Sequence, residues 1–313
     1  MDIHNLEQIK QEFSGFQQEF ENGNKEKALE KLLELLDALE EADTSRRAAQ
    51  IDKDGNVTLS SEIPAGKPAA EKSAEDGTGE SQPLYMSLNH VMEYYIFAYY
   101  FQPATEVRCT DIPYGEYYRT YGQLALSMQK YNGAKKAYER AIAWNPVDLD
   151  AYLGLAEVYK YQNQREKYLT VTKQVYRYCC TRATMARYYR NMAFYYLSGY
   201  EPETARACYQ YSNVYYHTEN ADSELKYISE AIQQETPQTD IRAIQKLFDE
   251  KQIEPGPDSQ TIGIVYKVGE ILLKDGDYKL AKDCYSIVYD ITQDAAAEKM
   301  LNELEAAISG SEE

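Results

Sequence analysis

The chain has 313 residues, a formal net charge of −18 and 27% charged residues. This acidity argues against a nucleic-acid-binding protein, because contacts to phosphates need clustered lysine and arginine side chains. The longest apolar block, residues 94–101, is far shorter than the roughly 20 residues of a membrane-spanning helix, and the first residues do not resemble a signal peptide. We therefore expect a cytoplasmic protein with neither a membrane nor a nucleic-acid partner.

Residues 1–42 are predicted to form a hairpin of two helices. Gly23 and Asn24 mark the break between them. In the second helix, apolar side chains recur at helical spacing, at Ala28, Leu32, Leu35, Leu36 and Leu39. The hairpin either caps the array that follows or packs separately.

Residues 43–83 are predicted to be a flexible linker or insertion. They contain no aromatic residue and are rich in Gly, Ser, Ala, Pro, Glu and Lys. Such a segment buries too little apolar surface to offset the entropy lost on ordering. Asp54-Gly55 is a weak signal for a β-hairpin within it. The run from Asp52 to Asn56 lacks the glycine and glutamate spacing of a calcium loop.

Residues 84–101 are predicted to form one apolar helix. Its apolar side chains lie on more than one side, so we expect it to be enclosed by other elements. Gln102 and Pro103 end it. The stripe with the most apolar residues comprises Met92, Tyr95, Ile96, Tyr99 and Tyr100.

Residues 115–146 are predicted to form two helices joined by a short turn at residues 131–133. Small residues, Gly122 and Ala134, lie where the two helices would approach most closely, and Tyr118 and Tyr138 would fill the space on either side. Pro146 ends the second helix. The faces that the two helices turn toward each other also include Tyr121 and Ala125 in the first helix and Ala141 in the second.

This hairpin resembles a tetratricopeptide repeat, a unit of about 34 residues with large, small and aromatic residues and a closing proline at fixed offsets. Tyr121 stands where the family usually has leucine, and Ala125 where it usually has tyrosine; the other positions match, including Pro146. The pair Gly122 and Ala134 is twelve positions apart, and the same offset recurs at Ala193/Ala205 and at Gly269/Ala281. Repeats are therefore predicted near residues 115–148, 149–182, 186–218 and 262–293, with a degenerate helical pair at 221–252 and a capping helix at 294–309.

The resemblance implies an all-α fold in which antiparallel helix pairs stack into a right-handed α-α superhelix, with the flexible insertion near its N-terminus. The helical array covers residues 84–309. We expect about 13 helices, and no β-sheet beyond one small hairpin.

The residue pattern does not indicate catalytic or metal-binding chemistry. His4, His90 and His217 are far apart in the sequence, and a metal site needs three or four convergent donors. The five cysteines show no CxxC spacing. Phosphate-binding loops and nucleophile motifs are absent from the sequence. We expect no metal, no cofactor and no enzymatic activity.

The resemblance also implies a concave groove lined by the first helix of each pair, where we place the candidate ligand-binding residues. A basic strip within it would bind an acidic segment or a peptide C-terminus, since guanidinium groups pair with carboxylates through two hydrogen bonds. The alternative is that these cations pair with nearby acids such as Glu116, Asp150 and Glu157. Some family members hold a C-terminus with a two-carboxylate clamp, but Gln123 and Gly154 stand here where that clamp has asparagine. The candidates are Arg119, Gln123, Lys160, Arg187, Arg190, Asn191, Phe194 and Tyr266.

The leading hypothesis is a non-catalytic scaffold that binds a peptide or protein segment in this groove. One alternative is a peptide-sensing bacterial regulator, although residues 1–42 contain no basic recognition helix. Another is a homo-oligomeric assembly protein, in which faces rich in the 31 tyrosines would pack together. The oligomeric state and the identity of the partner stay open.

Overall fold

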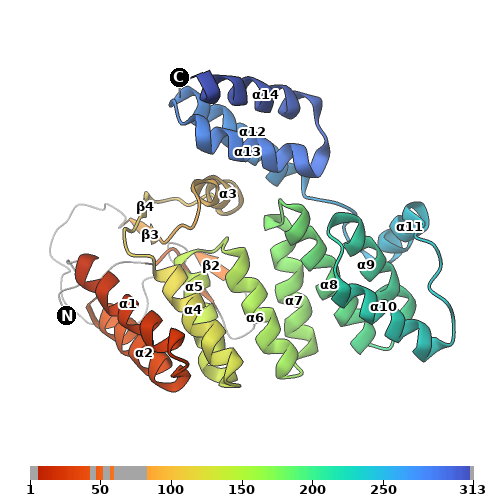
Figure 1. Cartoon of the computed structure of the whole chain (residues 1–313), viewed down its shortest axis with the longest axis horizontal. Helices are drawn as coiled ribbons and strands as arrows, with labels where there is room; N and C mark the ends of the chain where they lie inside the picture. Colours follow the sequence, from red (N-terminus) through yellow and green to blue (C-terminus); the bar gives the residue numbers. More distant parts are fainter. Residues whose placement is uncertain (1–5, 43–46, 52–56, 60–82, 311–313) are drawn as a thin grey trace. The chain divides into compact units, whose positions relative to one another are not determined.

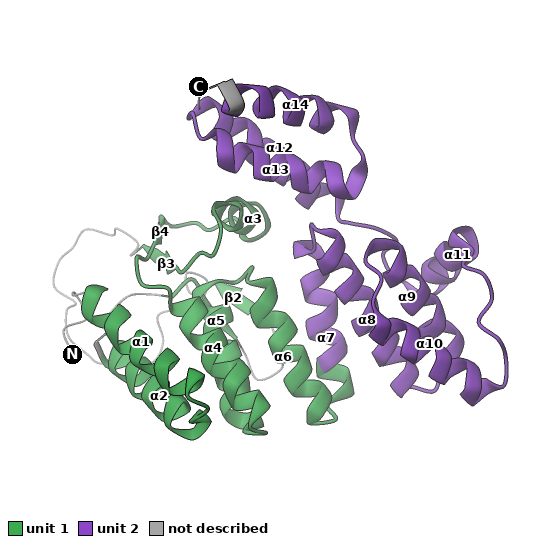
Figure 2. Cartoon of the chain, viewed as in Figure 1, with its two compact units in different colours: residues 1–167 green, residues 168–313 purple. Residues whose placement is uncertain are grey.

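The computed structural model describes residues 6–42, 47–51, 57–59 and 83–310 (Figure 1). The chain divides into two compact units, residues 1–167 and residues 168–313 (Figure 2). In the described residues there are fourteen α-helices, one short 3-10 helix and four short strands. The predicted all-α helical-repeat class is confirmed. Part of the predicted 43–83 insertion, including Asp54-Gly55, lies outside the described residues.

The first unit is built from packed helices with two small β-pairs. Helices α1 and α2 pack as one hairpin and α4 and α5 as a second, α2 packs on α4, and α6 packs on both α4 and α5. The ring of Phe13 on α1 stacks on Tyr117 of α4, with centroids 4.3 Å apart, so the N-terminal hairpin shares a core with the next one. The helices are α1 (Leu6–Glu21), α2 (Lys25–Ala42), α3 (Val91–Phe101), α4 (Tyr114–Ser127), α5 (Tyr131–Trp144) and α6 (Leu149–Tyr161).

The second unit contains two groups of helices. In one, α8 and α9 form a hairpin on which α10 and α11 both pack through α9; in the other, α12 and α13 form a hairpin and α14 packs on α13. The buried Tyr189 hydroxyl donates to the carbonyl of Glu254 (2.8 Å) and accepts from the Gly256 amide (2.7 Å), which anchors the segment before α12. The helices are α8 (Arg182–Ser198), α9 (Pro202–Tyr215), α10 (Glu219–Ile232), α11 (Ile241–Lys251), α12 (Ser259–Lys274), α13 (Tyr278–Thr292) and α14 (Ala295–Gly310), while α7 (Arg165–Val175) crosses the division between the units and the 3-10 helix follows it at Tyr176–Tyr178.

In two of the hairpins, a tyrosine of the second helix covers a glycine of the first helix. A Cβ atom added at Gly122 of α4 would lie 2.9 Å from ring carbons of Tyr138 on α5. The same contact recurs in the α12–α13 hairpin, where a Cβ on Gly269 would lie 3.0 Å from Cζ of Tyr285. In both hairpins the tyrosine follows the glycine by sixteen positions. Because the ring lies directly on the backbone, these helices approach closely only where the first one has no larger side chain.

The turns between paired helices place one residue in the left-handed backbone region. Gly23 has φ +79° and Gly276 has φ +84°, and the equivalent turns use Gln129 (φ +59°), Asn163 (φ +53°) and Tyr200 (φ +62°). Glycine and asparagine tolerate this conformation, whereas glutamine and tyrosine adopt it at a cost. The reversal of the chain is therefore a common feature of these hairpins, although glycine is not always present at the turn.

A small β-hairpin forms within the segment predicted to be a flexible insertion. Strand β1 (Ala49–Ile51) pairs antiparallel with β2 (Val57–Leu59), with Ala49 opposite Leu59 and Ile51 opposite Val57. Ala49 and Leu59 are buried, and β1 packs on α5. The hairpin signalled by the sequence at this place is therefore present, with its turn outside the described residues.

The prediction of one helix over residues 84–101 is wrong at its start. Residues Leu84–Met86 form strand β3, which pairs in parallel with β4 (Val107–Cys109), so the sheet content also exceeds the single expected hairpin. Helix α3 starts only at Val91, because the Glu93 carboxylate accepts hydrogen bonds from the backbone amides of Asn89 (2.6 Å) and His90 (3.3 Å). Through these bonds the Glu93 side chain satisfies the backbone amides of Asn89 and His90, which have no partner within the helix.

Glu19 fastens the α1–α2 hairpin, and we expect its contribution to depend on pH. Its carboxylate lies 2.7 Å from the Lys27 ammonium and accepts a hydrogen bond from the side-chain amide of Asn24 (3.0 Å). These two bonds lower the pKa of Glu19 from 4.5 to about 2. Since the folded-state pKa is lowered, the stabilisation is complete above about pH 4.5 and is lost as the pH falls toward about 2.

Glu19→Gln should therefore lower the midpoint of thermal unfolding near neutral pH, and the difference from the wild type should shrink as the solution is acidified. Glu12→Gln, at an exposed position on the same helix, is the matched control and should leave the midpoint unchanged. A difference between Glu19→Gln and the wild type that stays constant down to about pH 2 would contradict this role for the carboxylate.

Candidate functional site

The candidate residues fall into both compact units. Arg119 and Gln123 lie on α4 and Lys160 on α6, all in the first unit. The second unit contains Tyr266 on α12 and four candidates on α8. The structure therefore brings together one group, which we call the α8 face: Arg187, Arg190, Asn191 and Phe194.

Arg119 forms an ion pair inside the first unit. Its Nη1 atom pairs with Oδ2 of Asp148 and donates to Oδ1 of Asn89 (2.8 Å). The Asp148 side chain is 1% exposed and that of Arg119 is 15% exposed. Burial raises the pKa of Asp148, and the charge of Arg119 opposes that change. Asp148 also caps α6 by accepting a hydrogen bond from the Ala151 backbone amide (3.0 Å). Arg119 therefore pairs with a structural acid of its own unit, and this acid is not among those that we expected from the sequence.

The other two candidates of the first unit lie at the surface. Lys160 pairs with Glu157 one helical turn earlier, with Nζ and Oε2 3.8 Å apart, as the alternative reading of the sequence anticipates. Gln123 is exposed on α4. Neither residue has the buried surroundings that would fix a ligand in one orientation.

Gly154 explains why the two-carboxylate clamp is absent. A Cβ atom at this position of α6 would lie 2.2 Å from Cε1 of Tyr138. The tyrosine ring therefore occupies the space that an asparagine side chain would need. The departure from the clamp pattern follows from the packing of α5 against α6.

Helix α8 holds the α8 face in a fixed orientation. Its N-terminus is capped reciprocally, since Thr181 Oγ1 accepts from the Thr184 amide (3.2 Å) and Thr184 Oγ1 accepts from the Thr181 amide (3.0 Å). Positions 187, 190, 191 and 194 have the spacing of one helical stripe. The side chains that bury the helix on its other sides are Met185, Ala186, Tyr188, Tyr189, Met192, Ala193 and Tyr196.

Arg190 is half-buried and lies near the C-terminus of α9. Its Nη1 atom is 3.5 Å from the carbonyl oxygen of Tyr216, and no carboxylate of the described residues lies within ion-pair distance of its guanidinium. Burial, followed by the positive charge of Arg187, lowers the pKa of Arg190. Arg182 donates to the carbonyl of Val214 (2.8 Å) at the same helix end. The helix terminus attracts these cations through its partial negative charge, but it does not neutralise Arg190.

Asn191 carries a buried hydrogen-bond donor without a partner. The residue is 4% exposed, and its Nδ2 atom has no acceptor in the part of the chain that the structure describes. Leaving such a group unpaired costs about 1–3 kcal/mol. Next to it on the α8 face, the ring of Phe194 packs edge-on against Tyr168 at 5.2 Å. The face thus combines guanidinium groups, an unpaired amide donor and an aromatic ring.

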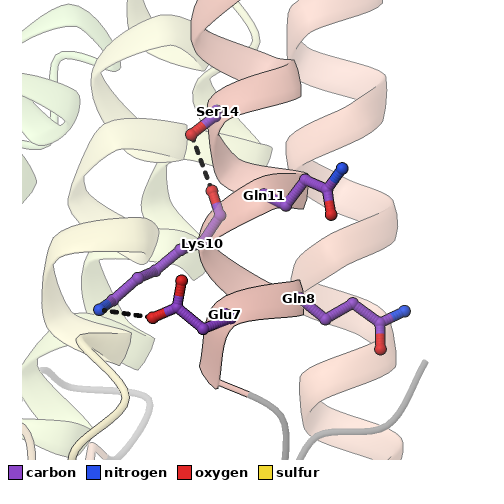
Figure 3. A pocket seen from close by; sticks show the side chains of 5 residues that line it. All are labelled: Glu7, Gln8, Lys10, Gln11 and Ser14. Carbon is purple, nitrogen blue, oxygen red and sulfur yellow. Dashed lines mark hydrogen bonds and ion pairs between the residues drawn. The ribbon is translucent and has the colours of Figure 1, made fainter.

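A shallow depression on α1 does not form a second such site. Figure 3 shows its five lining side chains, all from this one helix: Glu7, Gln8, Lys10, Gln11 and Ser14. Lys10 pairs with Glu7 at 3.5 Å, and Ser14 donates to the carbonyl of Lys10 (2.9 Å). These are the local contacts of a polar helix surface, and no other element of the described residues contributes to the depression.

The described ranges lack two other kinds of site. Within them, no group of three or more His, Cys, Asp and Glu side chains is arranged to hold a metal ion. No helix among the described residues combines the length and the apolar character needed to cross a membrane.

Residues 115–148 match the protein-family model described as "Tetratricopeptide repeat". The chain contains a tetratricopeptide repeat. The matched segment is the α4–α5 hairpin with the turn that follows it, so the family recognised from Gly122, Tyr138 and Pro146 is confirmed. Tetratricopeptide repeats are in general scaffolds for protein interaction, and their stacked helices provide extended binding surfaces.

Two solved structures are also similar to the chain. One is described as "Crystal structure of APC/C hetero-tetramer Cut9-Hcn1", at 13% identity and a TM-score of 0.35, with coverage of 63% of this chain and 38% of that one. The other, "Crystal structure of YrrB: a TPR protein with an unusual peptide-binding site", has 13% identity, a TM-score of 0.32 and coverage of 68% and 98%. No curated protein sequence matches the chain.

Proposed function

We propose that this tetratricopeptide-repeat protein is a non-catalytic interaction scaffold that binds an acidic peptide segment, or a peptide C-terminus, on the α8 face. The proposal is confined to Arg187, Arg190, Asn191 and Phe194. Arg119 is excluded from the ligand set because it is already paired with Asp148. Gln123, Lys160 and Tyr266 are likewise not needed for it.

The unpaired amide of Asn191 is the observation that carries the proposal. A buried donor without an acceptor is unfavourable in the free protein. Once the Asn191 side chain turns outward from its covered position, a ligand carbonyl or carboxylate oxygen would supply the missing hydrogen bond. Because the amide is held on a packed helix, the ligand would be bound in one orientation. Arg187 and Arg190 lie three residues apart on the same face, so further oxygen atoms of the ligand can reach both side chains.

Charge favours an acidic ligand at this place. The chain as a whole repels anions, since its net charge is −18. At the α8 face, by contrast, burial and the neighbouring Arg187 make the charged form of Arg190 less favourable, which a ligand carboxylate would reverse. Arginine pairs with a carboxylate through two parallel hydrogen bonds, so the contact would select a carboxylate over a neutral amide.

The test is affinity capture from the native lysate with three full-length proteins. These are the wild type, Arg187→Glu/Arg190→Glu, and Arg242→Glu/Lys246→Glu on exposed positions of α11, which changes the net charge equally. We expect the α8 variant to lose partners that the wild type and the α11 variant both retain. Capture of the same partners by the α8 variant would show that the α8 face does not bind them.

A further inference from the structure

The first unit has a groove between α2 and α5, with α4 as its floor. Its volume is about 370 Å³, at the lower end of the range for ligand pockets. The α2 wall includes Leu33, Asp37 and Glu40, which follow one stripe of the helix, and the α5 wall includes Gly133 and Arg140 at the equivalent spacing. Seven residues of helix rise about 10 Å, so the groove can hold a short peptide segment.

The two ends of the groove differ. One end is closed by Glu40, whose carboxylate pairs with Arg47 (2.7 Å) and with Arg140 of α5 (3.6 Å) and accepts a hydrogen bond from the Tyr118 hydroxyl. The other end is open and apolar. Leu33 is 41% exposed there. A Cβ on Gly133 would be 3.5 Å from the hydroxyl of Tyr121, so the missing side chain leaves this ring accessible.

The remaining charged residues that line the groove form no ion pair with the described residues. Asp37 and Glu41 are exposed on the α2 wall, and neither has an ion-pair partner among the described residues. Lys136 on the α5 wall is also exposed and unpaired in the described part of the chain. The unpaired side chains of the groove therefore carry a net negative charge, and the chain as a whole is also negative, at −18. The groove thus offers an apolar slot beside excess negative charge.

We propose that the α2–α5 groove binds a short segment of a partner protein that has one large apolar side chain close to lysine or arginine. The apolar side chain enters the slot between Leu33, Tyr121 and Ala137, and the cation pairs with Asp37 and Glu41. This charge preference is opposite to that of the α8 face. The proposal does not depend on the α8 face; if both hold, the chain can connect a basic partner to an acidic one.

The test uses fluorescein-labelled synthetic octapeptides and the full-length protein, with fluorescence anisotropy as the measurement. One set combines a single leucine or phenylalanine with two lysines at varied spacing, and the matched set replaces the lysines by glutamates. Two variants address the groove: Asp37→Lys/Glu41→Lys reverses its free charges, and Gly133→Leu fills the slot without changing charge. Gly133→Leu should not lower the thermal midpoint, because leucine has a higher helix propensity than glycine.

We expect a subset of the lysine peptides to bind the wild type, and each variant to weaken that binding about tenfold or more. The glutamate peptides should not bind in the groove, and Arg187→Glu/Arg190→Glu should leave the lysine peptides bound as in the wild type. The proposal is overturned if no lysine peptide binds, or if Asp37→Lys/Glu41→Lys binds them as tightly as the wild type. A wild-type dimer that Gly133→Leu turns into a monomer would show that a second copy fills the groove, and would also overturn it.

Discussion

Gly154→Ala is expected to destabilise the first unit by about 3 kcal/mol, at the upper end of the usual cost of overpacking. The added Cβ would lie 2.2 Å from Cε1 and 2.3 Å from Cζ of Tyr138. The ring has little room to retreat, because Gly122 of α4 is in contact with it as well and a Cβ there would already lie 2.9 Å away. The gain in helix propensity, about 1 kcal/mol, is too small to offset the clash.

Urea unfolding followed by tryptophan fluorescence would measure this change. The chain has one tryptophan, Trp144, which is buried at the end of α5 in the same unit as Gly154. Gly263→Ala on α12 is a matched control with open space around its Cβ, and should be neutral or slightly stabilising. An unfolding free energy of Gly154→Ala within about 0.5 kcal/mol of the wild type would contradict the packing described for Tyr138.

Asp148→Ala is expected to cost about 3–5 kcal/mol, because removing one member of a buried ion pair leaves the other charge without a partner. Arg119 would keep its charge with only 15% of its side chain exposed. The substitution also removes the cap of α6, where Asp148 accepts from the Ala151 amide, and loss of a cap alone costs about 1 kcal/mol.

The same fluorescence measurement can separate the ion pair from the cap. In Arg119→Met/Asp148→Asn the buried charges are gone, while asparagine can still cap the helix. We expect this double variant to recover most of the stability that Asp148→Ala loses. A double variant no more stable than Asp148→Ala, or a loss below about 1 kcal/mol in the single variant, would show that the pair is not responsible.

Local periodicity made the helical hairpins predictable. In the α4–α5 and α12–α13 hairpins, the small residue of the first helix and the tyrosine sixteen positions later lie in adjacent helices, so the hairpin itself sets their contact, as at Gly122 and Tyr138. The β3–β4 pair could not be predicted in this way. Its strands are three residues long and 23 positions apart at Leu84 and Val107, and parallel pairing at that separation leaves no periodic pattern. A local signal for the start of α3 was present in Glu93, three residues after the cap position.

The candidate site was predictable only as far as helical spacing determines it. The spacing alone groups Arg187, Arg190 and Phe194 on one stripe of a helix. It does not reveal that Asn191 is buried without a partner, because that depends on what the neighbouring helices provide. The pairing of Arg119 with Asp148 was missed for a similar reason, since the two residues lie on different elements. The position of Asp148 just before a helix, after Pro146, was the available sign of its capping role.

The most direct test of the α8 face is photo-crosslinking at position 194. p-Benzoylphenylalanine keeps the aromatic ring of Phe194 and can be placed, as a control, at the exposed Tyr227 of α10. After irradiation in the native lysate and mass spectrometry, we predict crosslinks at position 194 to peptides rich in Asp and Glu or to a C-terminus. These crosslinks should be lost in Arg187→Glu/Arg190→Glu and absent at position 227. Equal crosslinking at both positions, or a yield at 194 unchanged by the charge reversal, would contradict binding at the α8 face.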